Sequence, residues 1–153
     1  MIIYNNTIFK PKKGQFIVYE KITDPTVPNC IIEPVYDEIK KTKGVIIWKT
    51  IHGNVIVGPT AEMVESKTDR KTNEEILRSL KLFGEEKLPI LKHYKIIGSY
   101  SGIRPATQFT DYQINHYEKE NWICVGGIRS TGLRIGLIFF DKTFFYISFI
   151  IFL

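Results

Sequence analysis

The sequence predicts an α+β fold built on a mainly antiparallel sheet with one or two flanking helices. Short β-branched runs recur along the chain, glycine-containing turns separate them, and one segment carries clear helical periodicity. The length of 153 residues suffices for one domain with a hydrophobic core and is too short for two ordinary domains. Hydrophobic residues make up 44% and charged residues 24%, which excludes a disordered chain, a collagen-like chain and a polytopic membrane protein.

Strands are expected through the first 60 residues. Residues 15–20 alternate in character, which places Phe16 and Val18 on one face of a strand. Residues 27–36 contain two prolines and are therefore expected to be extended. The β-branched runs at 45–51 and 55–57 are separated by the sequence HGN, which predicts a hairpin with a glycine turn.

One clear helix is predicted after residue 72. The sequence TNEE at 72–75 has the spacing of a capping box, in which Thr72 would cap the helix and Glu75 would bond back to it. Apolar side chains then recur on one helical stripe, at Ile76, Leu80 and Phe83. Gly84 or Pro89 is expected to end this helix.

Two further strands are expected in the second half of the chain. Residues 95–100 form one candidate, which continues into the sequence GIRP at 102–105. Residues 121–125 form the other, which enters a glycine-rich loop at 126–132. Within this loop, Ser130 and Thr131 are candidate caps for a following helix.

The two ends of the chain differ in character. Residues 1–6 lack the basic start and long apolar run of a secretory signal. Cys30 and Cys124 stand far apart without a CxxC motif, which favours a reducing compartment, and we expect a cytoplasmic protein. Residues 135–153 are rich in Phe and Ile, but the uninterrupted apolar part falls short of the ~20 residues that a membrane span needs. A buried strand, an artefactual tail and, less favoured, a membrane-associated tail remain alternatives.

Charge and motif spacing exclude several kinds of site. Lys and Arg number 21 against 16 Asp and Glu, and the net charge of +5 suits anionic ligands. The basic residues are scattered, so no nucleic-acid interface is expected. The three histidines have no metal-ligand spacing, so no metal site is expected. The GSYSG string at 98–102 has Tyr100 at its centre, where a nucleophile elbow requires serine.

Three segments remain candidates for a functional site. The glycine-rich loop can present backbone N–H groups to an anion or a flat ring, although a plain tight turn is the commoner role of such a loop. Pro105 holds Arg104 extended, which suits a guanidinium that grips a carboxylate or phosphate; a surface ion pair is the alternative. His52 lies in the expected hairpin turn, as a proton carrier or as a polar turn residue.

Three strings occur in an order that resembles a known family: HGNVIVGPTAE at 52–62, GIRPATQFTDYQI at 102–114 and ICVGGIRSTGL at 123–133. They resemble the C-terminal part of the FAD-dependent oxidoreductases of the D-amino-acid oxidase superfamily. The glycerol-3-phosphate dehydrogenase and 2-hydroxyglutarate oxidase branch is the most similar. The string KGQF at 13–16, with Tyr19 and Lys21, resembles the strand that precedes this region, so the resemblance covers residues 9–133.

The resemblance implies a substrate sheet and the last flavin-contacting loop of an enzyme that uses FAD. Such an enzyme would oxidise a small anionic substrate (a 2-hydroxy acid, an amino acid or glycerol 3-phosphate) by hydride transfer to flavin. Arg104 would hold the acidic group of the substrate, with Thr107 as a second substrate contact and His52 as a lesser catalytic candidate. The cofactor-binding residues would be Gly126, Gly127, Ile128, Arg129, Ser130, Thr131, Gly132 and Leu133. The loop would lead to a helix N-terminus that stabilises negative charge on reduced flavin.

Two features depart from the family. The GxGxxG motif that binds the ADP half of FAD is absent, and bulky Phe and Ile follow Leu133 where the family has small residues. We therefore expect a partial, incomplete oxidoreductase domain at residues 1–133 and an aberrant hydrophobic tail at 134–153. The isolated chain is expected to be inactive, with the FAD-binding half absent or supplied by another chain. The alternative function is a non-catalytic anion-binding remnant or interaction module.

Overall fold

The computed structural model describes residues 9–32, 44–109, 113–119, 122–127 and 148–151. The described residues belong to two compact units. We call the unit formed from Lys13–Glu62 and Thr68–Ile103 the helix unit, and the unit formed from Met1–Lys12, Met63–Lys67 and Arg104–Leu153 the Arg104 unit. Residues 1–6, residues 33–36 of the expected extended segment and residues 128–147 lie outside the description, and with them the helix expected after Thr131.

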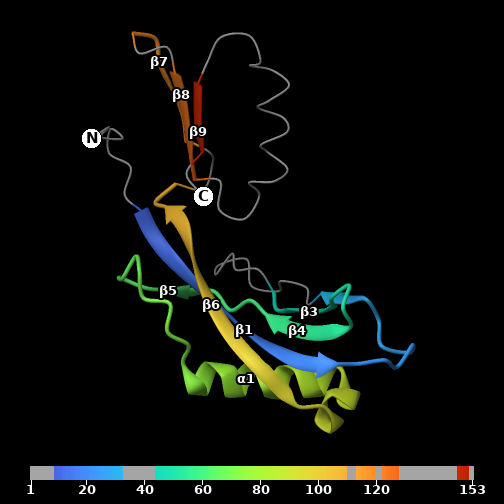
Figure 1. Cartoon of the computed structure of the whole chain (residues 1–153). Coiled ribbons are helices and arrows are strands. Elements are labelled where there is room, and N and C mark those ends of the chain that lie inside the picture. Colours follow the sequence, from blue (N-terminus) through green and yellow to red (C-terminus); the bar gives the residue numbers. More distant parts are fainter. Residues whose placement is uncertain (1–8, 33–43, 110–112, 120–121, 128–147, 152–153) are drawn as a thin grey trace. The chain divides into compact units, whose positions relative to one another are not determined.

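The larger sheet of the described residues has six strands (Figure 1). They are β1 (Phe9–Lys21), β2 (Cys30–Ile32), β3 (Ile46–Lys49), β4 (Asn54–Gly58), β5 (Glu62–Met63) and β6 (Ile96–Thr107). The strand order is β2-β3-β4-β1-β5, and β6 pairs with β1. The pairs β1–β4, β2–β3 and β3–β4 are antiparallel, which confirms the predicted fold class.

The predicted hairpin is confirmed as β3 and β4. Ile47 lies opposite Val57 and Trp48 opposite Ile56, and residues 51–53 form the turn between the strands. Gly53 has a φ of 91°, a backbone conformation that residues other than glycine rarely adopt. The turn is closed by the bond from Thr50 N to Asn54 O at 2.8 Å.

The core lies on one face of the sheet, where helix α1 (Glu74–Lys87) packs. Buried side chains alternate along the strands and meet residues from the helix and the loops; they are Ile17, Tyr19, Ile22, Val27, Ile47, Val55, Val57, Leu80 and Leu91. Phe16 and Val18 share a face, as the alternation predicts, but it is the opposite and half-buried one. Strand β1 therefore has apolar side chains on both faces.

Helix α1 begins one residue later than the capping-box spacing predicts. Asn73 is the N-cap, with extended backbone (φ −109°, ψ 125°), and its Oδ1 accepts from Glu75 N at 2.9 Å and from Ile76 N at 3.3 Å. The assignment of Thr72 as the cap is therefore wrong. The physical reason is that Asn73 N donates to Gln15 Oε1 at 2.7 Å, which fixes Asn73 at the helix entrance.

Pro89, and not Gly84, ends the helix. Helix α1 stops at Lys87, Leu88 caps it, and the 3₁₀ helix η1 (Pro89–His93) follows. Gly84 lies buried inside α1, where an added Cβ would approach Val57 Cγ2 to 3.1 Å. The missing side chain lets the helix backbone come close to strand β4.

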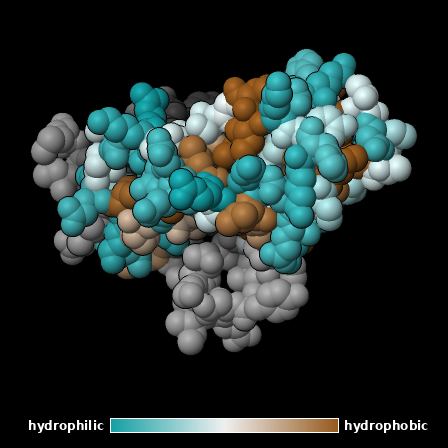
Figure 2. All heavy atoms as spheres, turned by 90° about the horizontal axis from the view of Figure 1, so that it is seen from below, coloured by the Kyte–Doolittle hydropathy of each residue, from teal (hydrophilic) through white to brown (hydrophobic). Residues whose placement is uncertain are grey.

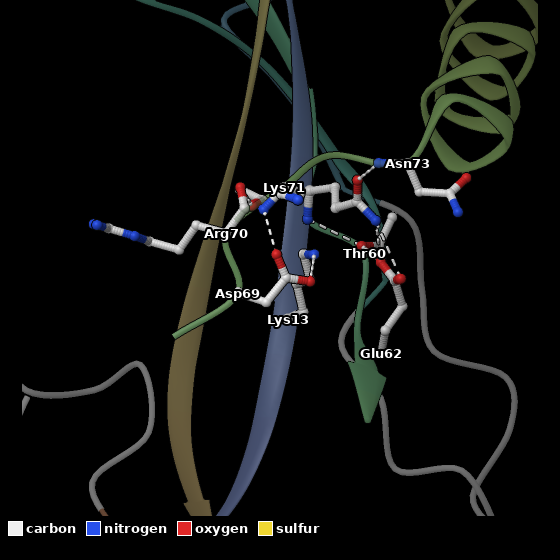
Figure 3. A network of polar contacts seen from close by, with 9 residues as sticks. Lys13, Thr60, Glu62, Asp69, Arg70, Lys71 and Asn73 are labelled. Atoms are coloured by element: carbon white, nitrogen blue, oxygen red, sulfur yellow. Dashed lines mark hydrogen bonds and ion pairs between the residues drawn. The ribbon is translucent and has the colours of Figure 1, made fainter. Parts of the chain in front are cut away.

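A polar network ties the entrance of α1 to the sheet (Figure 3). Gln15 is fully buried, and its Nε2 donates to both carboxylate oxygens of Glu62, at 2.9 and 3.1 Å. Its backbone N donates to Thr60 Oγ1 at 3.0 Å. Lys13 is buried beside it and pairs with Asp69 at 3.3 Å. Every named polar group of Gln15 thus has a partner, which offsets the cost of its burial.

The Arg104 unit contains a second, three-stranded sheet in the order β7-β8-β9. Strands β7 (Gln113–Tyr117) and β8 (Trp122–Gly126) are antiparallel, and β9 (Ser148–Ile151) pairs with β8 in parallel. The strand predicted at 121–125 is therefore confirmed, and part of the hydrophobic tail forms a strand. No helix in the described part of the chain has the length and apolar character to cross a membrane.

Candidate substrate and flavin site

Arg104 lies in strand β6, directly before Pro105, with the extended backbone that the sequence predicts. The residue is half-buried, and burial lowers the pKa of its guanidinium below the usual value. An arginine side chain stays charged under all ordinary conditions, even when its pKa falls somewhat. The result is a cation partly stripped of water, which interacts with an anion more strongly than an exposed arginine does.

Thr107, the second predicted substrate contact, is buried in the same strand. Its hydroxyl donates to Gln113 Oε1 at 2.9 Å and lies 3.4 Å from Phe109 O, so it ties β6 to the start of β7. Arg104 and Thr107 are three positions apart, and side chains at that spacing point to opposite sides of a regular strand. The geometry gives Thr107 a structural role, and its contact with substrate stays a prediction.

The start of the predicted flavin loop lies at the end of strand β8. Gly126 and Gly127 are both buried, and Gly127 has a φ of 72°, in the left-handed region that favours glycine. A strand end without Cβ atoms would allow a flat ring to approach the backbone, and the isoalloxazine contact of these two residues stays a prediction. Residues 128–133, which complete the predicted cofactor-binding set from Ile128 to Leu133, lie outside the description.

His52 is exposed in the turn between β3 and β4, and it belongs to the helix unit. Arg104, Thr107, Gly126 and Gly127 belong to the Arg104 unit. The described structure thus brings four predicted site residues into one unit and leaves His52 in the other. Its catalytic role stays a prediction, while its position in the turn is the one that turn chemistry favours.

An aromatic cluster on the sheet face opposite the core was not predicted. Phe16 stacks on Tyr100 with ring centroids 4.6 Å apart and meets Trp48 edge-on at 6.0 Å. Beside it, the strand registers align Val18, Ile56, Trp48 and Cys30 in one cross-strand row. The alternation of β1 could have indicated a second apolar face, but the pairing with β6 could not be inferred from spacing.

Metal-ligand chemistry has no built site in the described residues. No group of three or more His, Cys, Asp or Glu side chains gathers there in an arrangement that could hold a metal ion.

Comparison with known proteins places these features in a family. The family model described as FAD dependent oxidoreductase (DAO) matches residues 3–139. The chain is 30% identical over 135 residues to a glycerol 3-phosphate dehydrogenase of Caloramator mitchellensis. The aligned residues make up 87% of this chain and 27% of that protein. It is 30% identical over 125 residues to a glycerol 3-phosphate oxidase of Mycoplasma genitalium, covering 80% of this chain and 32% of that protein.

A solved structure shares the fold. The L-proline dehydrogenase of P. horikoshii superposes with a TM-score of 0.65 and 21% sequence identity, over 82% of this chain and 32% of that one. The chain therefore spans about a third or less of the length of the proteins that it resembles.

Proposed function

Because the chain belongs to the family of FAD-dependent oxidoreductases, we propose that it forms part of an enzyme that oxidises a small anionic substrate by hydride transfer to flavin. The single observation that carries the proposal is the half-buried guanidinium of Arg104 in strand β6, directly before Pro105. The substrates considered are a 2-hydroxy acid, an amino acid and glycerol 3-phosphate. Each combines an anionic group with a carbon that bears a hydroxyl or amino group and a hydrogen.

Arg104 binds and orients the substrate in this proposal. A guanidinium offers two parallel N–H donors to a carboxylate or phosphate, and this bidentate grip fixes the direction of the anion as well as its place. The extended backbone before Pro105 fixes where the Arg104 side chain leaves strand β6. Fixing the anionic group in this way also positions the carbon to be oxidised. Holding two reactants in the right geometry lowers the entropic part of the activation barrier.

Gly126, Gly127 and residues 128–133 are proposed to lie against the flavin. FAD supplies the two-electron acceptor for the hydride. The backbone N–H groups of a glycine loop can stabilise the negative charge that reduction brings, and Gly127 has the left-handed backbone that favours glycine in such a loop. His52 stays the lesser catalytic candidate, by the resemblance alone.

Glycerol 3-phosphate is the substrate that the sequence comparison favours, because both relatives described above are named as glycerol 3-phosphate enzymes. A phosphate would also suit the bidentate donors of Arg104. The sequence has no GxGxxG motif, so we propose that any working enzyme takes the contacts to the ADP half of FAD from another chain or segment.

The role of Arg104 is tested by two substitutions in the full chain. Arg104→Gln removes the charge at similar length, and we expect binding of glycerol 3-phosphate to weaken by about 10- to 100-fold, the worth of a charge-assisted hydrogen bond. Arg104→Lys keeps the charge but not the two parallel donors, so affinity should recover only in part. Titration calorimetry with glycerol 3-phosphate measures both.

The control for this experiment is Lys92→Gln, which removes an exposed charge of η1 and should leave affinity unchanged. Equal affinity of wild type and Arg104→Gln would contradict the proposed substrate contact. Binding that depends on Arg104 but is indifferent to added FAD would instead favour a non-catalytic anion-binding module.

A further inference from the structure

The exposed surface of the described residues does not by itself identify a binding site. The chain spans about a third or less of the length of the proteins that it resembles, so exposure does not show a surface open to a partner. Figure 2 shows hydrophobic patches set among hydrophilic side chains on one face of the molecule, and these patches identify no partner for the same reason. Buried contacts inside the Arg104 unit do not depend on what lies outside the chain, and they connect two parts of the proposed site.

The proposed hydride transfer requires Arg104 and Gly126 to keep a fixed spacing. The substrate anion would lie on the Arg104 guanidinium, and the flavin would lie against Gly126. Reacting atoms must come within about 3–3.5 Å, and a misplacement of about 1 Å can cost about 100-fold in rate. The two residues are 22 positions apart in sequence, so contacts between strands have to set their spacing.

The Thr107 hydroxyl joins strand β6 to strand β7. Thr107 is 5% exposed and follows Arg104 by three positions, which corresponds to about 10 Å along an extended strand. Its hydroxyl donates to Gln113 Oε1 at 2.9 Å, whereas Phe109 O lies farther away at 3.4 Å. A hydroxyl has one hydrogen to donate, and the shorter contact takes it. Because buried hydroxyl groups are seldom left unpaired, this bond fixes the Gln113 side chain relative to β6.

Gln113 continues the connection to the predicted flavin loop. It is the first residue of β7, and in the antiparallel β7–β8 pair it lies directly opposite Gly126. Opposite residues of antiparallel strands have Cα atoms about 4.5–5.5 Å apart, so a displacement of one backbone is passed to the other. The path from Arg104 to Gly126 thus consists of three positions of β6, one hydrogen bond and one strand pair.

Thr107 is better placed for this connection than for a contact with the substrate anion. Three positions of a regular strand turn its side chain to the face opposite Arg104. An anion on the Arg104 guanidinium would then be separated from the Thr107 hydroxyl by the strand itself. Any effect of Thr107 on the reaction would pass through Gln113.

We propose that Thr107 and Gln113 are positioning residues, which together form a clasp that holds Arg104 at a fixed spacing from Gly126. The proposal rests on the proposed function, because that function assigns the substrate to Arg104 and the flavin to Gly126. Neither residue of this β6–β7 clasp touches the substrate or the flavin. The clasp instead makes the surroundings of Gly126 respond when an anion binds to Arg104.

The clasp is tested in the full chain by following backbone amide signals in NMR while glycerol 3-phosphate is added to saturation. We expect the ligand to shift the amides of Ala106, two positions after Arg104, and of Gly126. Thr107→Val removes the hydroxyl at similar shape, and the ratio of the Gly126 shift to the Ala106 shift should fall by about half, since coupling follows contiguous contacts. Thr107→Ser keeps the hydroxyl and should restore the wild-type ratio.

Two further variants complete the test. Gln113→Met removes the acceptor of the same bond and should lower the ratio as Thr107→Val does, and it decides the matter if Thr107→Val fails to fold. Thr50→Val is the matched control. Thr50 Oγ1 is buried with no hydrogen-bond partner among the described residues, and Thr50 belongs to the helix unit, so its loss should leave the ratio unchanged. Because both shifts are read at saturation, a plain loss of affinity does not alter the ratio.

Hydrogen exchange tests the clasp without any ligand. Loss of one hydrogen bond should speed exchange of the amides at the Gln113–Gly126 end of the β7–β8 pair by about fivefold in Thr107→Val, and not in Thr50→Val. This measurement separates failure of the clasp from failure of the proposed function. Faster exchange without Arg104-dependent binding of glycerol 3-phosphate would mean that the clasp exists but positions no substrate, which overturns its positioning role.

Two other results would overturn the proposal. One is an equal ratio of the Gly126 and Ala106 shifts in wild type, Thr107→Val and Gln113→Met. The other is a loss of affinity in Thr107→Val as large as that in Arg104→Gln with the ratio unchanged, which would show that Thr107 contacts the substrate directly.

Discussion

The Tyr19 hydroxyl is a buried polar group without a hydrogen-bond partner among the described residues. Burial and, to a lesser degree, the negative charge of Glu85 raise the pKa of Tyr19 to about 12. Ionising the Tyr19 phenol therefore costs more free energy in the folded chain than in the unfolded one, where the pKa lies near 10. The Tyr19 ring fills space in the core, while its hydroxyl is buried without a hydrogen bond.

The pH dependence of stability follows from this difference. The folded state keeps the Tyr19 proton above pH 10 while the unfolded state loses it, so this contribution is present below pH 10 and is lost as pH rises toward 12. We expect wild type to lose about 1.4 kcal/mol relative to Tyr19→Phe between pH 8 and pH 11, from a difference of two pKa units. Urea unfolding of both proteins at the two pH values measures it, and parallel pH curves would contradict the assignment.

At the scale of single residues, the sequence predicted backbone conformation better than burial and hydrogen-bond partners. Pro105 fixes the backbone of Arg104 through a local clash, so the extended conformation could be inferred from two adjacent letters. The burial of Arg104 and the bond from Thr107 to Gln113 depend on which strands meet, and adjacent letters do not encode that. For the same reason the burial of Gln15 among polar partners was not foreseen.

At the scale of elements, the start of helix α1 shows a tertiary contact overriding the cap residue that local sequence favours. Thr72 and Asn73 are both favourable cap residues, and only Thr72 has Glu at the capping-box spacing. The structure uses Asn73, because Gln15, 58 positions away in sequence, binds its backbone N–H. The hairpin of β3 and β4 was predictable because its turn and both strands lie within 13 consecutive residues, 46–58.

The cap assignment predicts unequal effects of two neighbouring substitutions. Asn73→Ala removes the acceptor for Glu75 N and Ile76 N and should reduce the free energy of unfolding by about 1 kcal/mol. Thr72→Ala, the matched control, should change it by less than about 0.5 kcal/mol. Thermal unfolding followed by circular dichroism compares them. A larger loss of unfolding free energy in Thr72→Ala than in Asn73→Ala would show instead that Thr72 caps the helix.

At the scale of the whole molecule, the fold class could be predicted but the strand order could not. Alternation and glycine turns mark strands, whereas the pairing of β6 with β1 and of β9 with β8 joins segments that are distant in sequence. Resemblance indicated the family, because it compares ordered strings and not single motifs. The boundary predicted at residue 133 stays a prediction.

The reaction itself is predicted to be absent from the chain alone. With added FAD and glycerol 3-phosphate, we expect no turnover above the rate without substrate, because the chain lacks the GxGxxG motif that holds the ADP half of FAD. Reduction of an artificial dye and release of peroxide would both be measured. Substrate-dependent turnover that Arg104→Gln abolishes would contradict this prediction while supporting the proposed substrate contact.

The buried network around Gln15 also bears on the order of folding. Its partners Glu62 and Asn73 lie 47 and 58 positions along the chain, so the network closes only after long loops have been drawn together. Contacts of this separation cost chain entropy before they return any stability, and we expect them to form after the transition state. Such contacts leave the folding rate nearly unchanged and slow unfolding instead, so Gln15 would set how long the native chain persists.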